Sequence, residues 1–574
     1  MRTCKWMVAA FLLITLSAVA QQQAAPGATQ PAADPAPAQT SNAAPTTLDQ
    51  VVERAVAREH ALIQMLANRT PLVETYLQNL KNDSELGPVP SGDHYYFGRL
   101  DMSENGRRDY LGKGSFQDNL LGGFGRLFKY DYNPAGFSWM VFADREDFDR
   151  ETYDFRYVHR EFLGDVRCIV FDVTPKPKSG KGRFQGRIWV EDQDFNIVRL
   201  NGTYVPHASG SFYFHMDSWR VNAVPGYWVP AYVYSEEGDF SYGSKDKFAF
   251  KAQTRIWGYN VRAGVKQDEM TQVLVDSSVK DTSPNAQDAS PLQAERAWQQ
   301  QAEDNVLERL ENAGLAAPSG DLDKVLQTVV TNLEVTNNID LPRPVRTRVL
   351  LTSPLESFSV GNTIVLSRGL IDVLPDEASL AMVLSHELAH IVLGHNLGSK
   401  YAFDDRMLFS DEATYKNLGF RHSPEEEEAA DKKALEILKN SPYANKLDSA
   451  GLFLRQLSDR GPQLTALLTP HLGNGFVDTK GNLIRFVALE QSAPKLEPTK
   501  LDQVAALPLG GRVRLSVWND QVEMIKTVPV AITSARDKMP FEVTPFFPRL
   551  TRLNSGTSTS ENTTAATGPD SSSN

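Results

Sequence analysis

The sequence predicts an α+β protein of several domains, in which an antiparallel β-sheet domain precedes a mainly α-helical domain. At 574 residues the chain is long enough for two to four domains. Residues 86–280 are rich in Phe, Tyr, Trp and Val, and their alternating apolar runs are separated by turn residues. Residues 321–495 instead carry apolar residues at helical spacing. The two halves therefore differ in secondary structure.

The first 20 residues predict a secretory signal peptide. Arg2 and Lys5 precede an apolar run from Met7 to Leu16, and Ala18-Val19-Ala20 supplies a small-residue cleavage site. This run is too short for a transmembrane helix, and no later stretch reaches about eighteen apolar residues. We therefore expect a secreted chain without a transmembrane helix after cleavage.

The cysteine content indicates the compartment of the mature chain, and the net charge indicates which binding partners to exclude. Cys4 leaves with the signal peptide, so Cys168 has no intrachain disulfide partner. A secreted chain without disulfides fits a bacterial periplasm. The formal net charge of −12 favours solubility and argues against nucleic-acid binding.

Two segments precede the sheet domain, one of low complexity and one with a helical pattern. The end of the chain is also of low complexity. Residues 21–46 are rich in Ala, Pro and Gln and predict a disordered linker. Residues 47–85 have leucines at helical spacing, which predicts a helical segment with a break near Pro71. Residues 551–574 are rich in Ser, Thr and Asn and predict a disordered tail.

The sheet domain reads as an antiparallel meander, in which Cys168–Val173, Phe184–Val190 and Phe195–Leu200 are successive strands. The stretch from Gly186 to Arg199, together with Trp228-Val229-Pro230, resembles the strands of LolA/LolB-like lipoprotein carriers. That resemblance implies a curved, half-barrel-like sheet whose concave face receives an acyl chain, a lipoprotein or an unfolded segment. The alternative is an ordinary antiparallel sheet buried against a helix.

Two further segments frame the helical domain. Residues 281–320 predict a linker helix, centred on the charged stretch Pro291–Leu315. Residues 496–550 contain the runs Gly511–Val517 and Val528–Ile532, which predict a small strand-rich appendage.

His386, Glu387 and His390 form the pattern H-E-x-x-H inside an apolar helical run. One helical turn separates the histidines, so both imidazoles leave the same face and can hold one zinc ion. Glu387 lies beside them and can take a proton from water at the metal. His395 is not expected to be the third ligand, because it lies half a turn away from His386 on the helix.

A later helix supplies a better third ligand. Ser423 and Glu426 form a capping-box pattern, which starts a helix that runs to about Asn440. Among the four consecutive glutamates, Glu427 shares a stripe with Asp431 that turns apolar further along, so this stripe faces inward. We therefore expect Glu427 to be the inward carboxylate, with Asp431 one turn behind it.

The combination of H-E-x-x-H with a downstream E-x-x-x-D resembles the M48 metallopeptidases. This resemblance implies one Zn²⁺ per chain, with His386, His390 and Glu427 as ligands and Glu387 as general base. It also implies that Asp431 orients one ligand imidazole. The family often has a further His after the second helix, for which the nearest match is His471 in Thr469-Pro470-His471-Leu472. His471 either polarises the substrate carbonyl or gates the site, or it is an ordinary loop histidine.

The resemblance further implies a zincin-type domain over residues 321–495 with a small edge β-hairpin. Val345–Leu351 and Phe358–Leu366, with a turn at Gly361-Asn362, read as that hairpin. A protein or peptide substrate would add to its edge as an extended strand. The chain is thus expected to be a zinc endopeptidase that hydrolyses envelope or misfolded proteins. The alternative is a periplasmic carrier or chaperone for lipoproteins or unfolded clients, in which zinc is structural.

Overall fold

The structure is a computed structural model that describes residues 45–102, 106–109, 134–206, 213–240, 248–259, 291–395, 419–526 and 530–553. The predicted signal peptide lies outside these residues. So do the predicted linker at 21–46, apart from its end, and the predicted tail at 551–574, apart from its first three residues. Within them, no helix is long and apolar enough to cross a membrane.

Helix α1 (Leu48–Leu66) begins at Thr47, whose side chain accepts a hydrogen bond from the Gln50 amide. The prediction of one helical segment over 47–85 is correct for α1 and wrong beyond it, because Leu72–Asp83 forms strand β1. Residues 72–79 of this strand are buried without alternation, so its leucines show no period of two.

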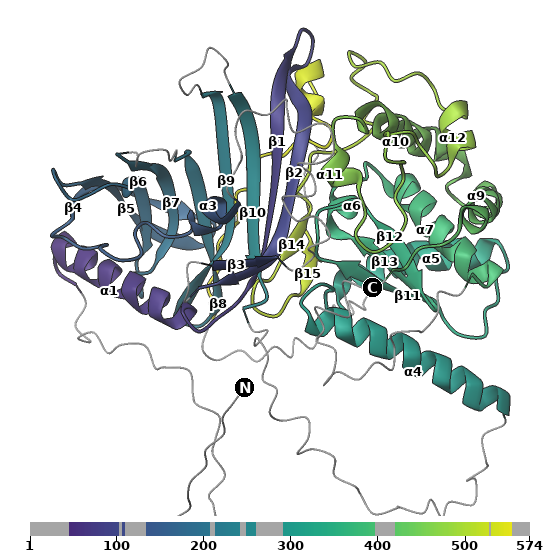
Figure 1. Ribbon diagram of the computed structural model, residues 1–574, viewed down its shortest axis with the longest axis horizontal. Coiled ribbons are helices and arrows are strands. Elements are labelled where there is room, and N and C mark those ends of the chain that lie inside the picture. Colours follow the sequence, from purple (N-terminus) through teal and green to yellow (C-terminus); the bar gives the residue numbers. More distant parts are fainter. Residues whose placement is uncertain are drawn as a thin grey trace, which may run out of the picture. The chain divides into compact units, whose positions relative to one another are not determined.

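The first part of the described chain forms an antiparallel ten-stranded sheet in the order β3-β2-β1-β10-β9-β8-β7-β6-β5-β4 (Figure 1). Its curvature and antiparallel pairing confirm the predicted fold class, and the sheet also includes β1. Gly186 and Gly202 lie opposite each other, where a Cβ on Gly186 would be 2.2 Å from the Asn201 carbonyl oxygen. Only glycine permits this close approach. The strands are β1 (Leu72–Asp83), β2 (Gly87–Asp101), β3 (Gly106–Asp109), β4 (Tyr153–Leu163), β5 (Val166–Pro175), β6 (Arg183–Glu191), β7 (Ile197–Val205), β8 (Met216–Val224), β9 (Tyr227–Phe240) and β10 (Phe248–Trp257).

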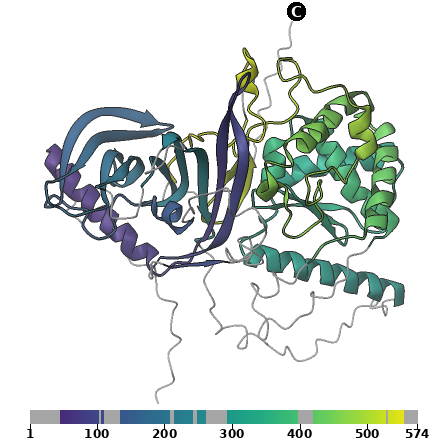
Figure 2. The ribbon, with the colours of Figure 1, turned by 45° about the horizontal axis from the view of Figure 1, so that its top comes forward.

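One face of this sheet carries α1 and the short helix α3 (Pro134–Trp139) (Figures 1 and 2). A buried ion pair fixes α1 there, because the two terminal guanidinium nitrogens of Arg220 in β8 donate to Glu59, at 2.6 and 2.7 Å. The carbonyl of Val141 accepts a further hydrogen bond from Arg220. A helix therefore covers part of the face on which a lipid or client site was predicted.

The predicted linker helix is α4 (Pro291–Asn312), and it is tied to the small sheet of the next domain. Glu303 of α4 pairs with Arg343 at 2.8 Å and with Arg346 at 2.6 Å. The same carboxylate accepts the backbone N–H of Asn362 in the turn of that sheet. The linker helix thus supports the strands beside the candidate site.

Helices surround a three-stranded sheet in the C-terminal half (Figure 2). The strands β12 and β13 form the predicted hairpin, with its turn at Gly361-Asn362. The earlier predicted strand, Val345–Leu351, corresponds to β11 and is not part of the hairpin. It lies parallel to β13, so β13 is the central strand. The elements are α5 (Asp321–Thr336), β11 (Arg346–Leu350), β12 (Ser357–Val360), β13 (Thr363–Ser367), α6 (Arg368–Val373), α7 (Glu377–Leu393), α9 (Pro424–Lys439), η1 (Ala444–Lys446), α10 (Leu447–Arg460), α11 (Thr465–Leu468) and α12 (Val487–Ser492).

The two sheets are connected through a buried ionic network. Glu74 of β1 accepts hydrogen bonds from Arg368 at 2.7 Å and from the Ser353 hydroxyl at 2.8 Å. Arg368 also pairs with Asp372, and the side chains of all three charged residues are at most 2% exposed. Buried charges require such partners, so this network specifies how β1 packs on α6.

The predicted strand-rich appendage at 496–550 has little strand among its described residues. Its described residues, which leave out 527–529, form β14 (Val513–Leu515), β15 (Val522–Met524) and the short 3₁₀ helix η2 (Ala535–Lys538), and residues 530–532 form no strand. Residues 541–553, here called the C-terminal strap, return to the ten-stranded sheet. The strap contacts Gln78 in β1, Lys251 in β10, Tyr232 in β9 and Asp165 in the β4–β5 turn. Its contacts are distant in sequence, which is why local patterns did not predict them.

Candidate metal centre

Helix α7 places both histidines of the H-E-x-x-H pattern in the interior. It begins at Asp376, whose carboxylate accepts the Ser379 amide at 2.8 Å, and it ends at Gly394 with a φ of 72°. All residues from Ala378 to His390 are buried. The helix is therefore enclosed on every side, and the polar groups of His386, Glu387 and His390 need internal partners.

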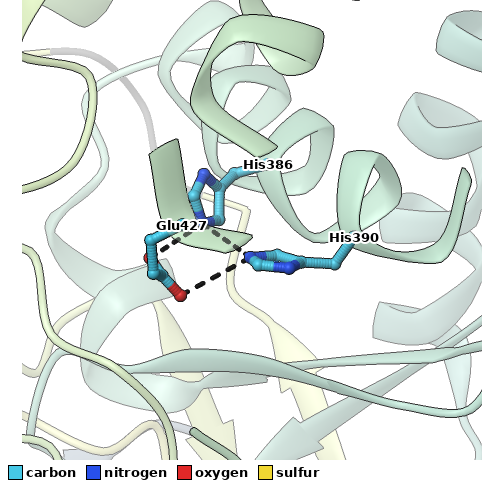
Figure 3. Close-up of side chains that lie close together, drawn as sticks. All are labelled: His386, His390 and Glu427. Carbon is cyan, nitrogen blue, oxygen red and sulfur yellow. Dashed lines mark hydrogen bonds and ion pairs between the residues drawn. The ribbon is translucent and has the colours of Figure 1, made fainter. Parts of the chain in front are cut away.

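Helix α9 supplies the carboxylate. Its predicted capping box is present, because the Glu426 amide donates to Ser423 Oγ and the Ser423 amide donates to Glu426 Oε2. Glu425 and Glu428 are exposed, and Glu428 pairs with Lys432 on the surface. Glu427 instead points at the two histidines, as Figure 3 shows.

The three donor atoms have the spacing of a metal site. His386 Nε2 and His390 Nε2 are 3.1 Å apart, and Glu427 carboxylate oxygens lie 3.3 Å from the first and 3.5 Å from the second (Figure 3). Ligands at about 2.0–2.1 Å from a tetrahedral zinc ion are about 3.3 Å from one another. The donor set of two imidazoles and one carboxylate therefore fits zinc in both chemistry and spacing.

Asp431 lies beside the first imidazole, one helical turn beyond Glu427. Its Oδ1 lies 2.9 Å from His386 Nδ1, on the opposite side of the ring from Glu427. Burial and the charge of Arg485 lower the pKa of His386, but contacts with Asp431 and Glu427 outweigh them and raise it. The contact places a carboxylate beside Nδ1, while Nε2 faces the other two donor atoms.

Glu387 is fully buried beside the three donor atoms. Its Oε1 accepts the Ser357 hydroxyl at 2.7 Å and lies 3.2 Å from Nη1 of Arg485. Burial raises the pKa of Glu387, but the positive charges of Arg485 and the two histidines lower it further, so the net shift is downward. Glu387 is therefore ionised at neutral pH, as an acceptor of protons must be.

Arg485 is a site residue that the sequence interpretation missed. Its Nε donates to Glu427 Oε2 at 2.8 Å, and its Nη1 donates to Ser357 Oγ at 3.0 Å. The side chain is 2% exposed, so its charge is compensated only inside the site. The available signal was an arginine within the apolar run Leu483-Ile484-Arg485-Phe486-Val487.

The backbone at Phe486 holds Arg485 in this position. Phe486 has a φ of 56°, which a non-glycine residue rarely adopts. Its N–H donates to Asp431 Oδ2 at 2.6 Å. One carboxylate thus contacts a candidate ligand, His386, and also accepts a hydrogen bond from the turn that carries Arg485.

Two further histidines surround His390. His395 Nδ1 lies 3.0 Å from His390 Nδ1, so His395 contacts a candidate ligand without joining the three donor atoms. The His422 ring stacks on His390 with centroids 3.8 Å apart. Burial and the proximity of His390 lower the pKa of His395 and lower that of His422 to about 4. Both rings are therefore neutral at neutral pH.

His471 is not one of the three donor residues. Its ring packs against Tyr95 of β2 with centroids 5.2 Å apart, and its backbone N–H donates to Glu356. Burial and Arg421 lower the pKa of His471 to about 4. Among the described residues it has no contact with the three donor atoms or Glu387. The position favours the loop-histidine interpretation over carbonyl polarisation.

Strand β12 lies at the edge of the small sheet, next to Glu387. Ser357 on this edge forms an isolated antiparallel bridge with Asn474. The Asn474 amide also donates to Glu427 Oε1 at 2.6 Å. The segment around Asn474 therefore occupies one end of the edge on which a substrate strand was predicted.

Comparisons with known proteins agree with this geometry in one part of the chain. No curated protein matches the chain. Residues 321–447, from the start of α5 to the start of α10, match the model of Peptidase family M48. The matched residues include His386, Glu387, His390, Glu427 and Asp431 but end before Arg485. This part of the chain is thus similar to the zinc-dependent metallopeptidases of family M48.

Proposed function

We propose that this protein is a zinc-dependent endopeptidase of the bacterial periplasm that hydrolyses peptide bonds in envelope or misfolded proteins. The single observation that carries the proposal is the arrangement of two imidazoles and one carboxylate at metal-ligand spacing with Glu387 beside them. The match of residues 321–447 to Peptidase family M48 supports a metallopeptidase.

The chemistry follows from the positions of the side chains. His386, His390 and Glu427 would hold the ion, and zinc supplies a Lewis acid that polarises the scissile carbonyl and acidifies water. Glu387 accepts the proton of the attacking water and then delivers it to the leaving amine. The Ser357 hydroxyl and Arg485 hold the Glu387 carboxylate in one orientation.

The substrate binds as an extended strand along β12. Among the described residues β13 is the one strand that pairs with β12, and the substrate strand would add to the opposite edge of β12. Asn474 already pairs with Ser357 at the end nearest the site. A substrate strand therefore pairs with residues 358–360 and replaces the Asn474 contact as it approaches Glu387.

The proposed location and client class depend on the N-terminal sequence. Arg2, Lys5 and the apolar run that follows them are the pattern of a signal peptide. A periplasmic enzyme that binds substrate mainly through backbone hydrogen bonds has weak sequence preference, which suits unfolded envelope proteins.

The decisive experiment compares the full chain with its Glu387→Gln variant. The wild type should contain one zinc ion per chain and cleave casein, whereas Glu387→Gln should retain the metal and lose cleavage. Glu425→Gln, an exposed glutamate of the same helix as Glu427, is the matched control and should cleave normally. Equal cleavage by Glu387→Gln and the wild type would instead favour a carrier or chaperone in which zinc is structural.

A further inference from the structure

A second pocket, separate from the three donor atoms, lies where three distant segments meet. It has a volume of about 160 Å³ and is bounded by the β1–β2 hairpin, the end of α10, residues 496–506 and residues 535–542. Its walls are mainly apolar, and they include Pro88, Val89, Val504, Ala505, Ala506 and Met539.

Arg460 is one of the residues that line this mainly apolar pocket. Among the residues that the structure describes, no carboxylate lies within ion-pair distance of its guanidinium and no hydrogen bond satisfies that group. Burial lowers the pKa of Arg460, and the nearby charges of Asp459, Asp83 and Glu542 only partly oppose this effect. A half-buried charge without a partner costs free energy, so an anion that paired with Arg460 would be bound favourably.

The other charged groups of the pocket are already engaged or exposed. Lys538 donates to the backbone carbonyls of Glu497, Lys500 and Gln503. Glu542 pairs with Lys251 at 2.7 Å. Arg536 and Asp459 are exposed at the rim. The pocket therefore has one positive charge, on Arg460, without a direct ion-pair partner among the described residues, beside a mainly apolar wall.

The position of Arg460 in its helix does not explain this arrangement. A basic residue in the last turn of α10 is favourable for the helix dipole. That effect accounts for an arginine at the end of the helix, and a fully solvated side chain would serve it equally well. It gives no reason for placing the guanidinium against an apolar wall.

We propose that this pocket binds the carboxyl-terminal residue of a polypeptide when that residue is apolar, with its carboxylate on Arg460. An apolar cavity of about 150 Å³ holds a benzene ring, so this volume suits one branched aliphatic or small aromatic residue. Arginine binds carboxylates in a two-pronged geometry, which gives selectivity for the acid over the amide. The choice of a polypeptide rests on the proposed function, because a peptidase meets and generates free carboxyl termini.

The test measures binding to the full-length Glu387→Gln protein by calorimetry, so that no ligand is consumed. N-acetyl-L-leucine should bind at least about tenfold more tightly than N-acetyl-L-leucinamide and than N-acetylglycine. Arg460→Gln should remove this preference, and Arg536→Gln, at the exposed rim, should retain it. Arg460→Lys keeps the charge and should retain part of the binding if the glutamine variant proves unstable.

Equal binding of the acid and the amide, or unchanged binding in a folded Arg460→Gln protein, would overturn the proposal. Tighter binding of isovalerate than of N-acetyl-L-leucine would also overturn it, because the ligand would then be a free acid. Casein cleavage by the wild type tests the peptidase independently. A peptidase that cleaves casein but fails the binding test would refute the pocket alone.

Discussion

The Nε of Arg485 lies 2.8 Å from Oε2 of Glu427, the carboxylate that completes the candidate metal centre. The same guanidinium reaches Glu387, so one buried cation compensates two buried carboxylates. Burial raises the pKa of Glu427, but Arg485 and hydrogen bonds with the two histidines lower it far below its usual value. In the described structure, the electrostatics of the site thus depend on a residue beyond the family match.

Arg485→Gln should destabilise the metal-free protein far more than the zinc-bound protein. Removing one partner of a buried ion pair costs about 3 kcal/mol, because it leaves Glu387 and Glu427 buried without a counter-charge. A bound zinc ion replaces much of that charge. Urea unfolding in chelator and in excess zinc measures the difference. The control Arg514→Gln, in an exposed pair with Glu523, should change the unfolding free energy in neither condition. An equal loss of unfolding free energy in chelator and in zinc for Arg485→Gln would contradict the role of Arg485 as the counter-charge.

Asp431→Asn should weaken zinc binding by about 10- to 100-fold while the helix remains folded. The asparagine cannot hold His386 through a charged acceptor at 2.9 Å, so the ring loses its preferred tautomer and orientation. Competition with a chromogenic chelator measures the affinity. Glu428→Gln changes an exposed carboxylate of the same helix and should leave zinc affinity unchanged. Unaltered affinity in Asp431→Asn would show that its role is confined to the Phe486 turn.

Glu356 should make stability depend on pH. Burial raises the pKa of this carboxyl from 4.5 to about 7, although backbone N–H groups of His471 and Leu472 oppose the shift. A raised pKa in the folded state means that folding favours the protonated form. The contribution of Glu356 to the unfolding free energy is therefore fully present below pH 4.5. It is lost as the pH rises toward 7, and above that pH it no longer changes.

The Glu356→Gln variant isolates this effect, because the amide does not titrate. Relative to the wild type, it should gain about 3 kcal/mol of unfolding free energy between pH 4.5 and pH 8. Urea unfolding of both proteins at several pH values measures the gain, and Glu425→Gln serves as the exposed control. A difference that stays constant with pH would show that Glu356 does not titrate in this range.

The fold class and the residues of the candidate metal centre could be predicted from the sequence because both depend on local patterns. The i, i+4 spacing of His386 and His390 fixes their common face, and the stripe through Glu427 and Asp431 fixes which glutamate points inward. Each of these inferences needs only one helix at a time. The β12–β13 hairpin was predicted for the same reason, through its Gly361-Asn362 turn.

Features that depend on distant segments were missed or wrong. Strand β1 was taken for helix because both of its faces are buried, and its Glu74 has partners almost 300 residues away. Arg485 follows a long loop, so no spacing relates it to Glu387. The C-terminal strap likewise has no pattern of its own, since its partners lie on strands at the other end of the sequence.

Glu542 should be a principal anchor of the C-terminal strap. Its carboxylate lies 2.7 Å from Lys251 Nζ, and the two side chains are 5% and 10% exposed. Glu236 is 3.9 Å from the same ammonium but is 45% exposed, so it compensates the charge only weakly. Glu542→Gln should therefore lower the unfolding free energy by about 3 kcal/mol, because a nearly buried lysine loses its partner.

The double variant Lys251→Met/Glu542→Leu separates the charge from the packing of the strap. Replacing both members of a buried pair by apolar groups of similar size is often neutral, so this variant should recover most of the loss. Urea unfolding measures all three proteins, and Glu523→Gln, in an exposed pair with Arg514, should have almost no effect. Zinc affinity should stay constant throughout, since none of these residues contacts the three donor atoms. If the double variant were as unstable as Glu542→Gln, the ion pair would not be the anchor. The loss of unfolding free energy would then come from packing or from backbone contacts, such as those of Gln78 with Phe541 and Val543.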